Sequence, residues 1–250
     1  MGELSDPRPT EVAPIGGQGM AQKNAKADAV QVWVSDSYFN TLIYRRLRAV
    51  FGDEPTVKED PEDLDWRAQV YERYTGAMPQ EDTELPKLFV GQFPHIRFNK
   101  PLPDFFVANG YYVASERFAN VLRSFDIGVG RLIPVPIFQG NCKDLVPGTF
   151  FLLQFGCRKT CFLPEHSNER FTSRGRTATI PEKWGLLGDL RDDYCALSPE
   201  ALVGSDLWFD TRVGELFFLS GRLIDALRAA KVTRTLRLRQ CRIVANQVEA

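Results

Sequence analysis

The distribution of apolar and polar residues along the chain predicts many short strands. Val30, Val32 and Val34 alternate with other residues in AVQVWV, which predicts a strand because successive strand side chains point to opposite faces. From residue 86 onward, short aromatic or β-branched runs are bounded by Gly, Pro, Asn or Asp and predict further strands. These runs are LFVGQ, HIRF, DFFVA, YYVA, RLIPVPIFQ, TFFLLQF, LWFD, ELFFL and TLRLRQCRIV. Pro134 and Pro136 lack amide hydrogens, so their run is expected at a sheet edge or as irregular chain.

A helix is expected over residues 39–51. Its apolar positions recur at the spacing of one helix face and are Phe39, Leu42, Ile43, Leu47, Val50 and Phe51. Asp36 or Ser37 can accept hydrogen bonds from the first-turn amides as the N-cap. Residues 164–178 are polar instead, and predict an exposed loop.

One local pattern occurs twice. Tyr112–Ser115 leads into an apolar helix face formed by Phe118, Val121, Leu122 and Phe125. Phe217–Ser220, 105 residues later, leads into Leu223, Ala226, Leu227 and Ala230. Each segment predicts a strand, a serine N-cap and an amphipathic helix, followed by another strand. We interpret them as two similar corners of one fold, with both serines in structural roles.

These elements together predict an α+β fold in a single domain, a mixed sheet of short strands with about three covering helices. Residues 1–29 are poor in large apolar residues and predict a flexible N-terminal arm. The domain is expected over residues 30–250. Its first part, 30–85, holds a strand, a helix and an acidic segment, and residues 86–245 form the strand-rich core.

Composition excludes several protein classes. With 44% hydrophobic and 25% charged residues, the chain is typical of a globular protein and unlike a disordered or collagen-like one. No apolar run approaches the roughly 18 residues of a transmembrane helix, and no signal-peptide pattern begins the sequence. Five cysteines with irregular spacing predict cytosolic thiols and a cytoplasmic protein.

Acidic residues gather in residues 51–85. Eleven acids against three bases give this segment a net charge of −8, in a chain whose net charge is −1. Such a run forms either a solvated polar face or a docking surface for a basic partner. The C-terminal part is basic, since Arg222, Arg228, Lys231, Arg234, Arg237, Arg239 and Arg242 face one acid, Asp225. We expect these bases to pair with the acidic segment in preference to nucleic acid, which remains a weaker alternative.

Candidate catalytic chemistry is sparse. The sequence has two histidines and lacks the H-E-x-x-H, P-loop and Rossmann glycine motifs. Cys157, Cys161 and His166, with Cys142 as a fourth ligand, are the best zinc candidate. The same set is the alternative for a cysteine-dependent enzyme, because Arg158 and Lys159 would lower a thiol pKa. Ordinary thiols are the favoured interpretation, so no enzyme activity, metal or cofactor is predicted.

The stretch LPDFFVANGYYVASERFANVLRSF resembles a bacterial immunity-protein family encoded beside polymorphic toxins, whose signature reads lPDf…vvSerf…vl. The resemblance continues in LIPV at residues 132–135, in DLWF at 206–209 and in LSGRLIDAL at 219–227, and covers about residues 86–245. It implies a protein that binds and neutralises a cognate toxin. The acidic segment is the expected toxin-binding surface, with Trp66 and Tyr71 as anchors. The expected contact residues are Asp53, Glu54, Glu59, Asp60, Glu62, Asp63, Asp65, Trp66, Tyr71, Glu81, Asp82 and Glu84.

Overall fold

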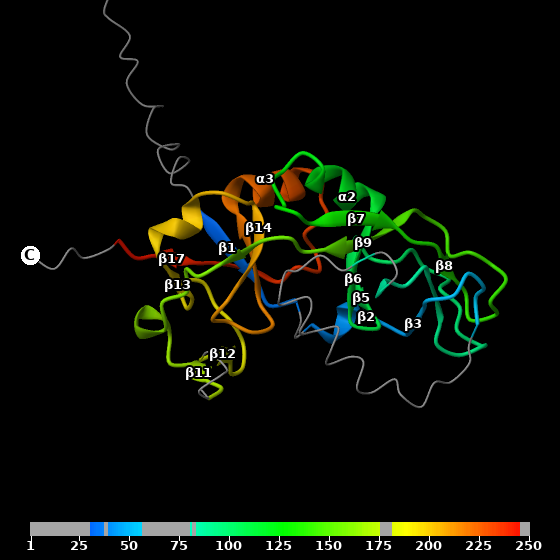
Figure 1. Ribbon diagram of the computed structural model, residues 1–250, viewed down its shortest axis with the longest axis horizontal. Helices are drawn as coiled ribbons and strands as arrows, with labels where there is room; N and C mark the ends of the chain where they lie inside the picture. Colours follow the sequence, from blue (N-terminus) through cyan, green and yellow to red (C-terminus); the bar gives the residue numbers. More distant parts are fainter. Residues whose placement is uncertain (1–30, 38–39, 57–80, 82–83, 176–181, 246–250) are drawn as a thin grey trace, which may run out of the picture.

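The computed structural model describes residues 31–37, 40–56, 81, 84–175 and 182–245. In this part of the chain, short strands form mixed sheets, and two α-helices lie side by side on one side of them (Figure 1). The helices are α2 (Glu116–Leu122) and α3 (Gly221–Ala229). The α+β class is confirmed, with two described α-helices where about three were expected.

Two five-stranded sheets share one architecture. Sheet 1 has the spatial order β2 (Tyr44–Arg45), β5 (Phe105–Ala108), β6 (Tyr111–Ser115), β9 (Phe150–Gln154) and β7 (Arg131–Pro134). Sheet 2 has the order β10 (Arg158–Lys159), β14 (Leu207–Asp210), β15 (Phe217–Ser220), β1 (Val32–Ser35) and β16 (Leu238–Gln240). In both sheets the first pair of strands is parallel and the other three pairs are antiparallel.

Equivalent strands of the two sheets are also paired in the same register. Ser115, at the end of β6, lies opposite Phe150 of β9, and Ser220, at the end of β15, lies opposite Val32 of β1. The first strand of the chain therefore takes in sheet 2 the place that β9 takes in sheet 1. Sheet 2 becomes complete only when β1 inserts between β15 and β16.

The side chains of β1 explain why it holds this interior position between β15 and β16. Val32 and Val34 are buried in an apolar cluster on one face of sheet 2, as the predicted alternation requires. Trp33 points to the other face, where the Arg228 guanidinium of α3 lies 4.2 Å from its ring centre. The predicted first strand is thus confirmed, with its start at Val32.

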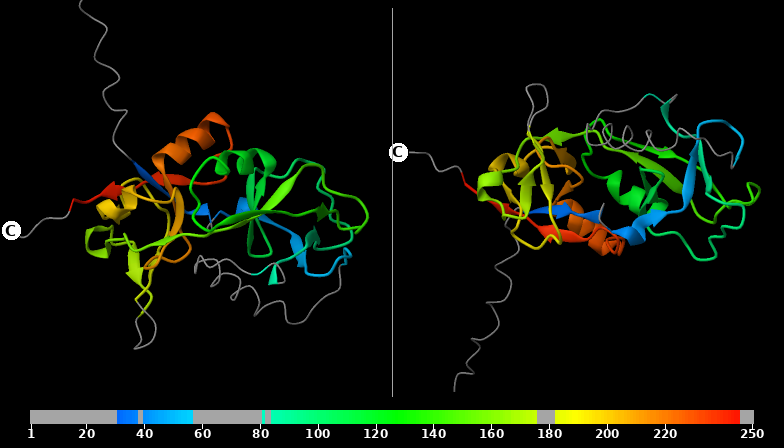
Figure 2. Two further views of the ribbon diagram at one scale, coloured as in Figure 1. Left: turned by 45° about the horizontal axis from the view of Figure 1, so that its top comes forward. Right: turned by 90° about the horizontal axis from the view of Figure 1, so that it is seen from below.

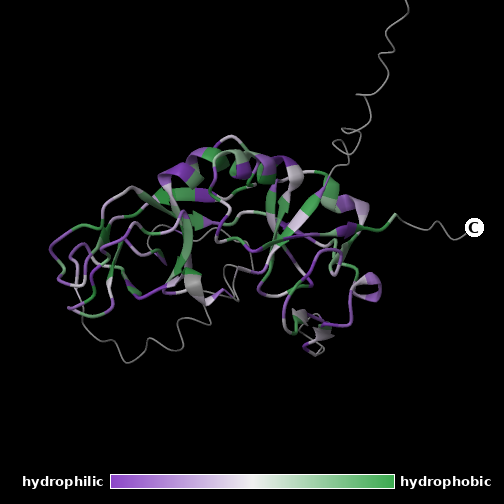
Figure 3. Ribbon diagram, turned by 180° about the vertical axis from the view of Figure 1, so that it is seen from behind, coloured by the Kyte–Doolittle hydropathy of each residue, from purple (hydrophilic) through white to green (hydrophobic). Residues whose placement is uncertain are grey.

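One apolar core joins the two sheets. Phe217 of sheet 2 lies 5.7 Å from Phe105 and 5.9 Å from Tyr112 of sheet 1, measured between ring centres. Phe155, after β9, lies 4.5 Å from Phe209. We call the part built around sheet 1 and the part built around sheet 2 the two halves of the molecule. Figure 3 shows apolar strands in the interior of both halves, with polar residues along the connecting loops. Burial of each such ring contributes about 1.5–3 kcal/mol, so the halves stabilise each other.

Smaller sheets extend the molecule at both ends (Figure 1). At one end lie β3 (Leu47–Val50), β4 (Leu88–Gly91) and β8 (Ile137–Phe138). At the other end lie the pairs β11 (Phe171–Ser173) with β12 (Trp184–Leu186) and β13 (Ala196–Leu197) with β17 (Arg242–Ile243). The 3-10 turns are η2 (Thr41–Ile43), η4 (Pro164–His166) and η5 (Pro199–Leu202).

The predicted helix over residues 39–51 is wrong. Its described part forms η2, β2 and β3, while Phe39 lies outside the described residues. Ile43, Leu47 and Val50 are buried as expected, but Ile43 belongs to η2, and Leu47 and Val50 belong to β3, which pairs antiparallel with β4. Leu47 and Val50, three residues apart, join different apolar clusters on opposite faces of β3, so both faces of this strand are covered where the spacing had indicated one helix face.

Three further expectations met different outcomes. The strand predicted at HIRF, residues 95–98, is wrong, because these residues form no strand. The exposed loop predicted from residue 164 is also wrong in part, because residues 164–175 contain η4 and β11 and Phe171 is buried. The proline-containing strand β7 does lie at the edge of sheet 1. An edge position suits Pro134 because it has no amide hydrogen to donate.

The two predicted corners are confirmed. The Ser115 hydroxyl accepts a hydrogen bond from the Phe118 amide at 3.3 Å, and the Ser220 hydroxyl accepts one from the Leu223 amide at 3.2 Å. Leu122 and Leu227 are fully buried. The serines therefore begin α2 and α3 as N-caps.

The corners also contact each other reciprocally. Asp126 follows α2 and Asp206 precedes β14. The Asp206 amide donates to the Asp126 carbonyl at 2.6 Å, and the Asp126 amide donates to the Asp206 carboxylate at 3.0 Å. Thr235, after α3, donates to the carbonyl of Phe105, which begins β5, at 2.9 Å. Each half thus holds the start of the other half's hairpin, as the subunits of a two-fold dimer do.

Candidate functional site

The structure describes four of the twelve residues expected to bind a partner. Asp53, Glu54, Glu81 and Glu84 are all exposed. The other eight lie outside the described residues, namely Glu59, Asp60, Glu62, Asp63, Asp65, Trp66, Tyr71 and Asp82. Asp53 and Glu54 follow β3, and Glu81 and Glu84 precede β4. The strands β3 and β4 pair with each other at one end of the molecule.

The turn after β3 carries the first two acids. The Lys87 amide, just before β4, extends the pairing of β3 with β4 by donating to the Val50 carbonyl at 2.9 Å. The Lys87 ammonium also donates to the Asp53 carboxylate at 2.7 Å, and the side chains of both residues are more than half exposed. An exposed ion pair of this kind contributes at most about 1 kcal/mol, so Asp53 can exchange this partner for another.

Phe51 is an exposed aromatic side chain that the sequence analysis missed. It stands beside Gly52 and Asp53, and 41% of its surface is exposed. The predicted helix placed it on a buried face. The signal that could have identified it is the turn-forming sequence Phe-Gly-Asp-Glu-Pro directly after an apolar run.

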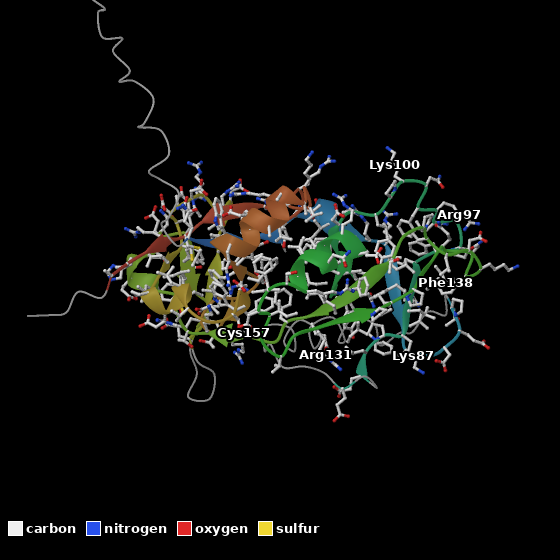
Figure 4. The ribbon with its side chains drawn as sticks, turned by 90° about the horizontal axis from the view of Figure 1, so that it is seen from above. Lys87, Arg97, Lys100, Arg131, Phe138 and Cys157 are labelled. Carbon is white, nitrogen blue, oxygen red and sulfur yellow. The ribbon has the colours of Figure 1, made fainter. Side chains whose placement is uncertain are left out.

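Basic side chains lie at the same end of the molecule. Figure 4 shows Lys87 there together with Arg97 and Lys100, which belong to the connection between β4 and β5. The described residues at this end therefore carry both signs of charge. The acidic excess of the segment resides in residues 57–83, which contain eight of its eleven acids.

The cysteine and histidine candidates lie in different environments. Cys161 is buried in an apolar cluster, Cys157 is partly exposed, and His166 is exposed in η4. Burial, followed by the nearby Asp210 carboxylate, raises the pKa of Cys161 to about 11, although Lys159 acts in the lowering direction. The expectation of a lowered pKa is therefore wrong for Cys161. Within the described ranges, no three His, Cys, Asp or Glu side chains gather as a metal site would require.

Lys159 makes contacts that stabilise the fold instead. Its ammonium donates to the carbonyls of Val203 and Ser205 at 2.8 and 3.0 Å. It also lies 3.6 Å from the ring centre of Trp208. Burial lowers the pKa of Lys159. This lysine joins β10 to the turn after η5 and supports sheet 2.

Two of the C-terminal arginines, Arg222 and Arg237, pair with acids outside the segment 51–85. Arg222 binds Asp206 at 2.6 Å, and Arg237 binds Asp36 and Asp189 at 3.0 and 3.1 Å. For these two arginines the described ion pairs are therefore with acids outside the segment, and most acids of the segment itself lie outside the described residues. The two arginines brace sheet 2 internally.

Comparisons with known proteins leave the family open. No family model matches the chain, and no curated protein matches it in sequence. Neither described α-helix has the length and apolar character needed to span a bilayer. The function is therefore argued from the residues themselves.

Proposed function

We propose that this protein binds a toxin protein with a basic surface and neutralises it by covering that surface. The observation that carries the proposal is the concentration of acid in residues 51–85, net −8 in a chain of net −1. Like charges massed in one segment repel each other and give a folded chain little stability. All four described acids of the segment are exposed, which is the placement a docking surface needs.

The family resemblance supports the same class of function. Its signature residues include Asp104, Ser115 and Ser220, and these lie in the two corners, where they hold the hairpins and helices together. They therefore support a shared fold and do not mark the binding surface. The surface is assigned from charge and exposure alone.

The mechanism is competition for a phosphate-binding cleft. A toxin that acts on nucleic acid holds phosphates with basic side chains, and an acidic surface can occupy that cleft and exclude the substrate. Long-range attraction raises association rate constants to about 10⁸–10⁹ M⁻¹ s⁻¹ at low salt. Buried aromatic anchors then slow dissociation, and Trp66, Tyr71 and Phe51 are the candidates.

The experiment measures association with the toxin encoded beside this chain's gene. Reversal of Glu59, Asp60, Glu62 and Asp63 to Lys should slow association about tenfold or more at low salt and less at high salt. Trp66→Ala should leave association nearly unchanged and speed dissociation. Both rate constants are measured at two salt concentrations, with circular dichroism to confirm folding.

A matched pair of variants separates location from total charge. Glu54→Lys/Glu81→Lys changes two exposed acids in the proposed surface. Glu165→Lys/Glu169→Lys changes two exposed acids in and after η4, at the opposite end of the molecule (Figure 2). Slower association in the first variant alone supports the proposal. Equal effects of the two variants, or unchanged association in the fourfold reversal, would place the binding surface elsewhere.

A further inference from the structure

Two buried cysteines lie side by side where the C-terminal strand joins the rest of the protein. β13 and β17 pair in parallel, with Ala196 opposite Arg242. Cys195 and Cys241 each precede their strand by one residue. The Arg242 amide donates to the Cys195 carbonyl at 2.9 Å, so the register continues to the cysteines and places them opposite each other.

The two thiols are free and share one apolar cluster. Cys195 is fully buried and Cys241 is 5% exposed. Neighbouring strands lie about 4.8 Å apart, and a disulfide bridges Cα atoms about 4.4–6.8 Å apart. The Cys195 thiol is also among the groups that raise the pKa of Cys241, which agrees with the two side chains being neighbours. A disulfide can therefore form with little movement of either strand.

The surrounding chain holds both cysteines in place. The Gln240 amide donates to the Asp192 carboxylate at 2.8 Å, and the Gln240 carbonyl accepts from the Asp193 amide at 2.9 Å. The Cys241 amide donates to the Val32 carbonyl of β1 at 2.9 Å. These contacts join the segments that carry the two cysteines to each other and to β1, an interior strand of sheet 2.

We propose that Cys195 and Cys241 form a reversible dithiol–disulfide couple, oxidised by a peroxide, that fastens β17 to β13. The thiolate of Cys241, the more exposed of the two, attacks one peroxide oxygen. The O–O bond breaks, and a sulfenic acid and hydroxide are produced. The Cys195 thiolate then attacks that sulfur, so the S–S bond forms and the S–O bond breaks. The two thiols lose two electrons, and the peroxide leaves as two waters carrying the two thiol protons.

The environment sets the rate of this reaction. Burial, reinforced by the Cys195 thiol and by the Asp193 and Asp192 carboxylates, raises the pKa of Cys241 well above its usual range. The reactive thiolate is therefore scarce at neutral pH, and oxidation should accelerate as the pH rises. An open depression is lined by His166, Ser167, Asn168, Asp193 and Arg242, the last of which directly follows Cys241 in the sequence.

The disulfide would enclose β13, η5, β14, β15, α3 and β16 in one covalent loop. Such a loop restricts the unfolded chain more than the folded one. Oxidation should therefore raise the Tm, by about 5–10 °C for a chain of this size.

The test uses the full, folded chain. The reduced protein is treated with hydrogen peroxide at mildly alkaline pH, free thiols are blocked with N-ethylmaleimide, and the digest is analysed by mass spectrometry. We expect a peptide pair linked through Cys195 and Cys241 and lighter by two hydrogens. Dithiothreitol should reverse both the link and the rise in Tm.

Two variants control the result. Cys142→Ala/Cys157→Ala removes the two partly exposed thiols and should keep the link, whereas Cys241→Ala should abolish the link and the rise in Tm. The double variant and the wild-type peptide map decide the question even if Cys241→Ala fails to fold. Blocking of both thiols by N-ethylmaleimide after oxidation, or a link from either one to Cys161, would overturn the proposal.

Discussion

The two corners of the molecule contain the same three residue types but differ in how deeply they are buried. In the first corner, Asp104 accepts from the Ser115 hydroxyl at 2.7 Å and pairs with Arg117 at 3.5 Å. In the second, Asp206 accepts from the Ser220 hydroxyl at 2.5 Å and from two Arg222 nitrogens at 2.6 and 2.7 Å. The side chain of Asp104 is 24% exposed and that of Asp206 only 1%.

This difference gives one aspartate a larger structural role. Asp206 also accepts from the Asp126 amide of the first half, at 3.0 Å. Burial alone would raise its pKa, but the hydrogen bonds from Arg222, Ser220 and the Asp126 amide outweigh burial and hold the pKa below its usual value. The aspartate of the second corner thus bonds across to the first corner, whereas in the first corner it is Arg117 that reaches across, donating to the Ala230 carbonyl at the end of α3 at 2.8 Å.

The repeat extends to the strand under each helix. Arg123, after α2, lies 4.6 Å from the ring centre of Phe151 in β9. Arg228 of α3 lies 4.2 Å from that of Trp33 in β1. β9 and β1 are equivalent by register and by this contact, although β9 belongs to the middle of the chain and β1 to its start.

Loss of β1 should produce the largest effect. A chain that begins at residue 37 leaves β15 and β16 without the strand between them and exposes the apolar cluster that Val32 and Val34 cover. We expect it to lose cooperative unfolding. A chain that begins at residue 30 keeps β1 and should retain the full stability. Urea unfolding followed by circular dichroism distinguishes them, and equal stability would show that β1 is dispensable.

Cavities under the two helices should lower the free energy of unfolding by similar amounts. Leu122→Ala and Leu227→Ala each remove a fully buried side chain at equivalent positions of α2 and α3. Each should lower the free energy of unfolding by about 2–5 kcal/mol. Chemical denaturation measures both, and a negligible loss in one of them would show that its half can repack around the cavity.

Removal of the aspartate should destabilise the protein more in the second corner than in the first. Asp206→Ala leaves the Asp126 amide and the Ser220 hydroxyl without their acceptor, and should cost about 3 kcal/mol. Asp104→Ala, at the more exposed corner, should cost about 1 kcal/mol. Equal losses would mean that burial does not distinguish the two corners.

The same comparison has a pH dependence with a definite sign. Because the pKa of Asp206 is lower in the folded chain than in the unfolded one, its contribution is present above about pH 4 and is lost as the pH falls through the folded value. Wild type should therefore lose more stability than Asp206→Asn between neutral and acidic pH. Identical pH profiles would contradict the lowered pKa.

The caps should show the smallest effect. Ser115→Ala and Ser220→Ala each remove a hydroxyl that accepts from a first-turn amide. Each should cost about 1 kcal/mol. Neither should abolish protection against the toxin in a growth assay while stability is preserved. Such a loss in either variant would assign that serine a role in binding.

Part of the candidate site could be predicted from sequence, and part could not. The acidic character of residues 51–85 is a matter of composition, so it could be counted directly. The exposure of Phe51 depended on whether the preceding residues formed a helix or a strand, and that in turn depended on β4. The partners of Arg222 and Arg237 could not be foreseen, because Asp206, Asp36 and Asp189 come from loops brought together by the fold.

The sequence by itself determined the two corners. A serine that caps a helix and the apolar face that follows it act within one or two helical turns, so adjacent residues contain the whole interaction. Only the tertiary structure decided that β1 completes sheet 2, that residues 44–50 form strands, and that Cys195 meets Cys241. A strand is stabilised by hydrogen bonds to a partner elsewhere in the chain, and the local pattern of apolar residues does not specify which partner that is.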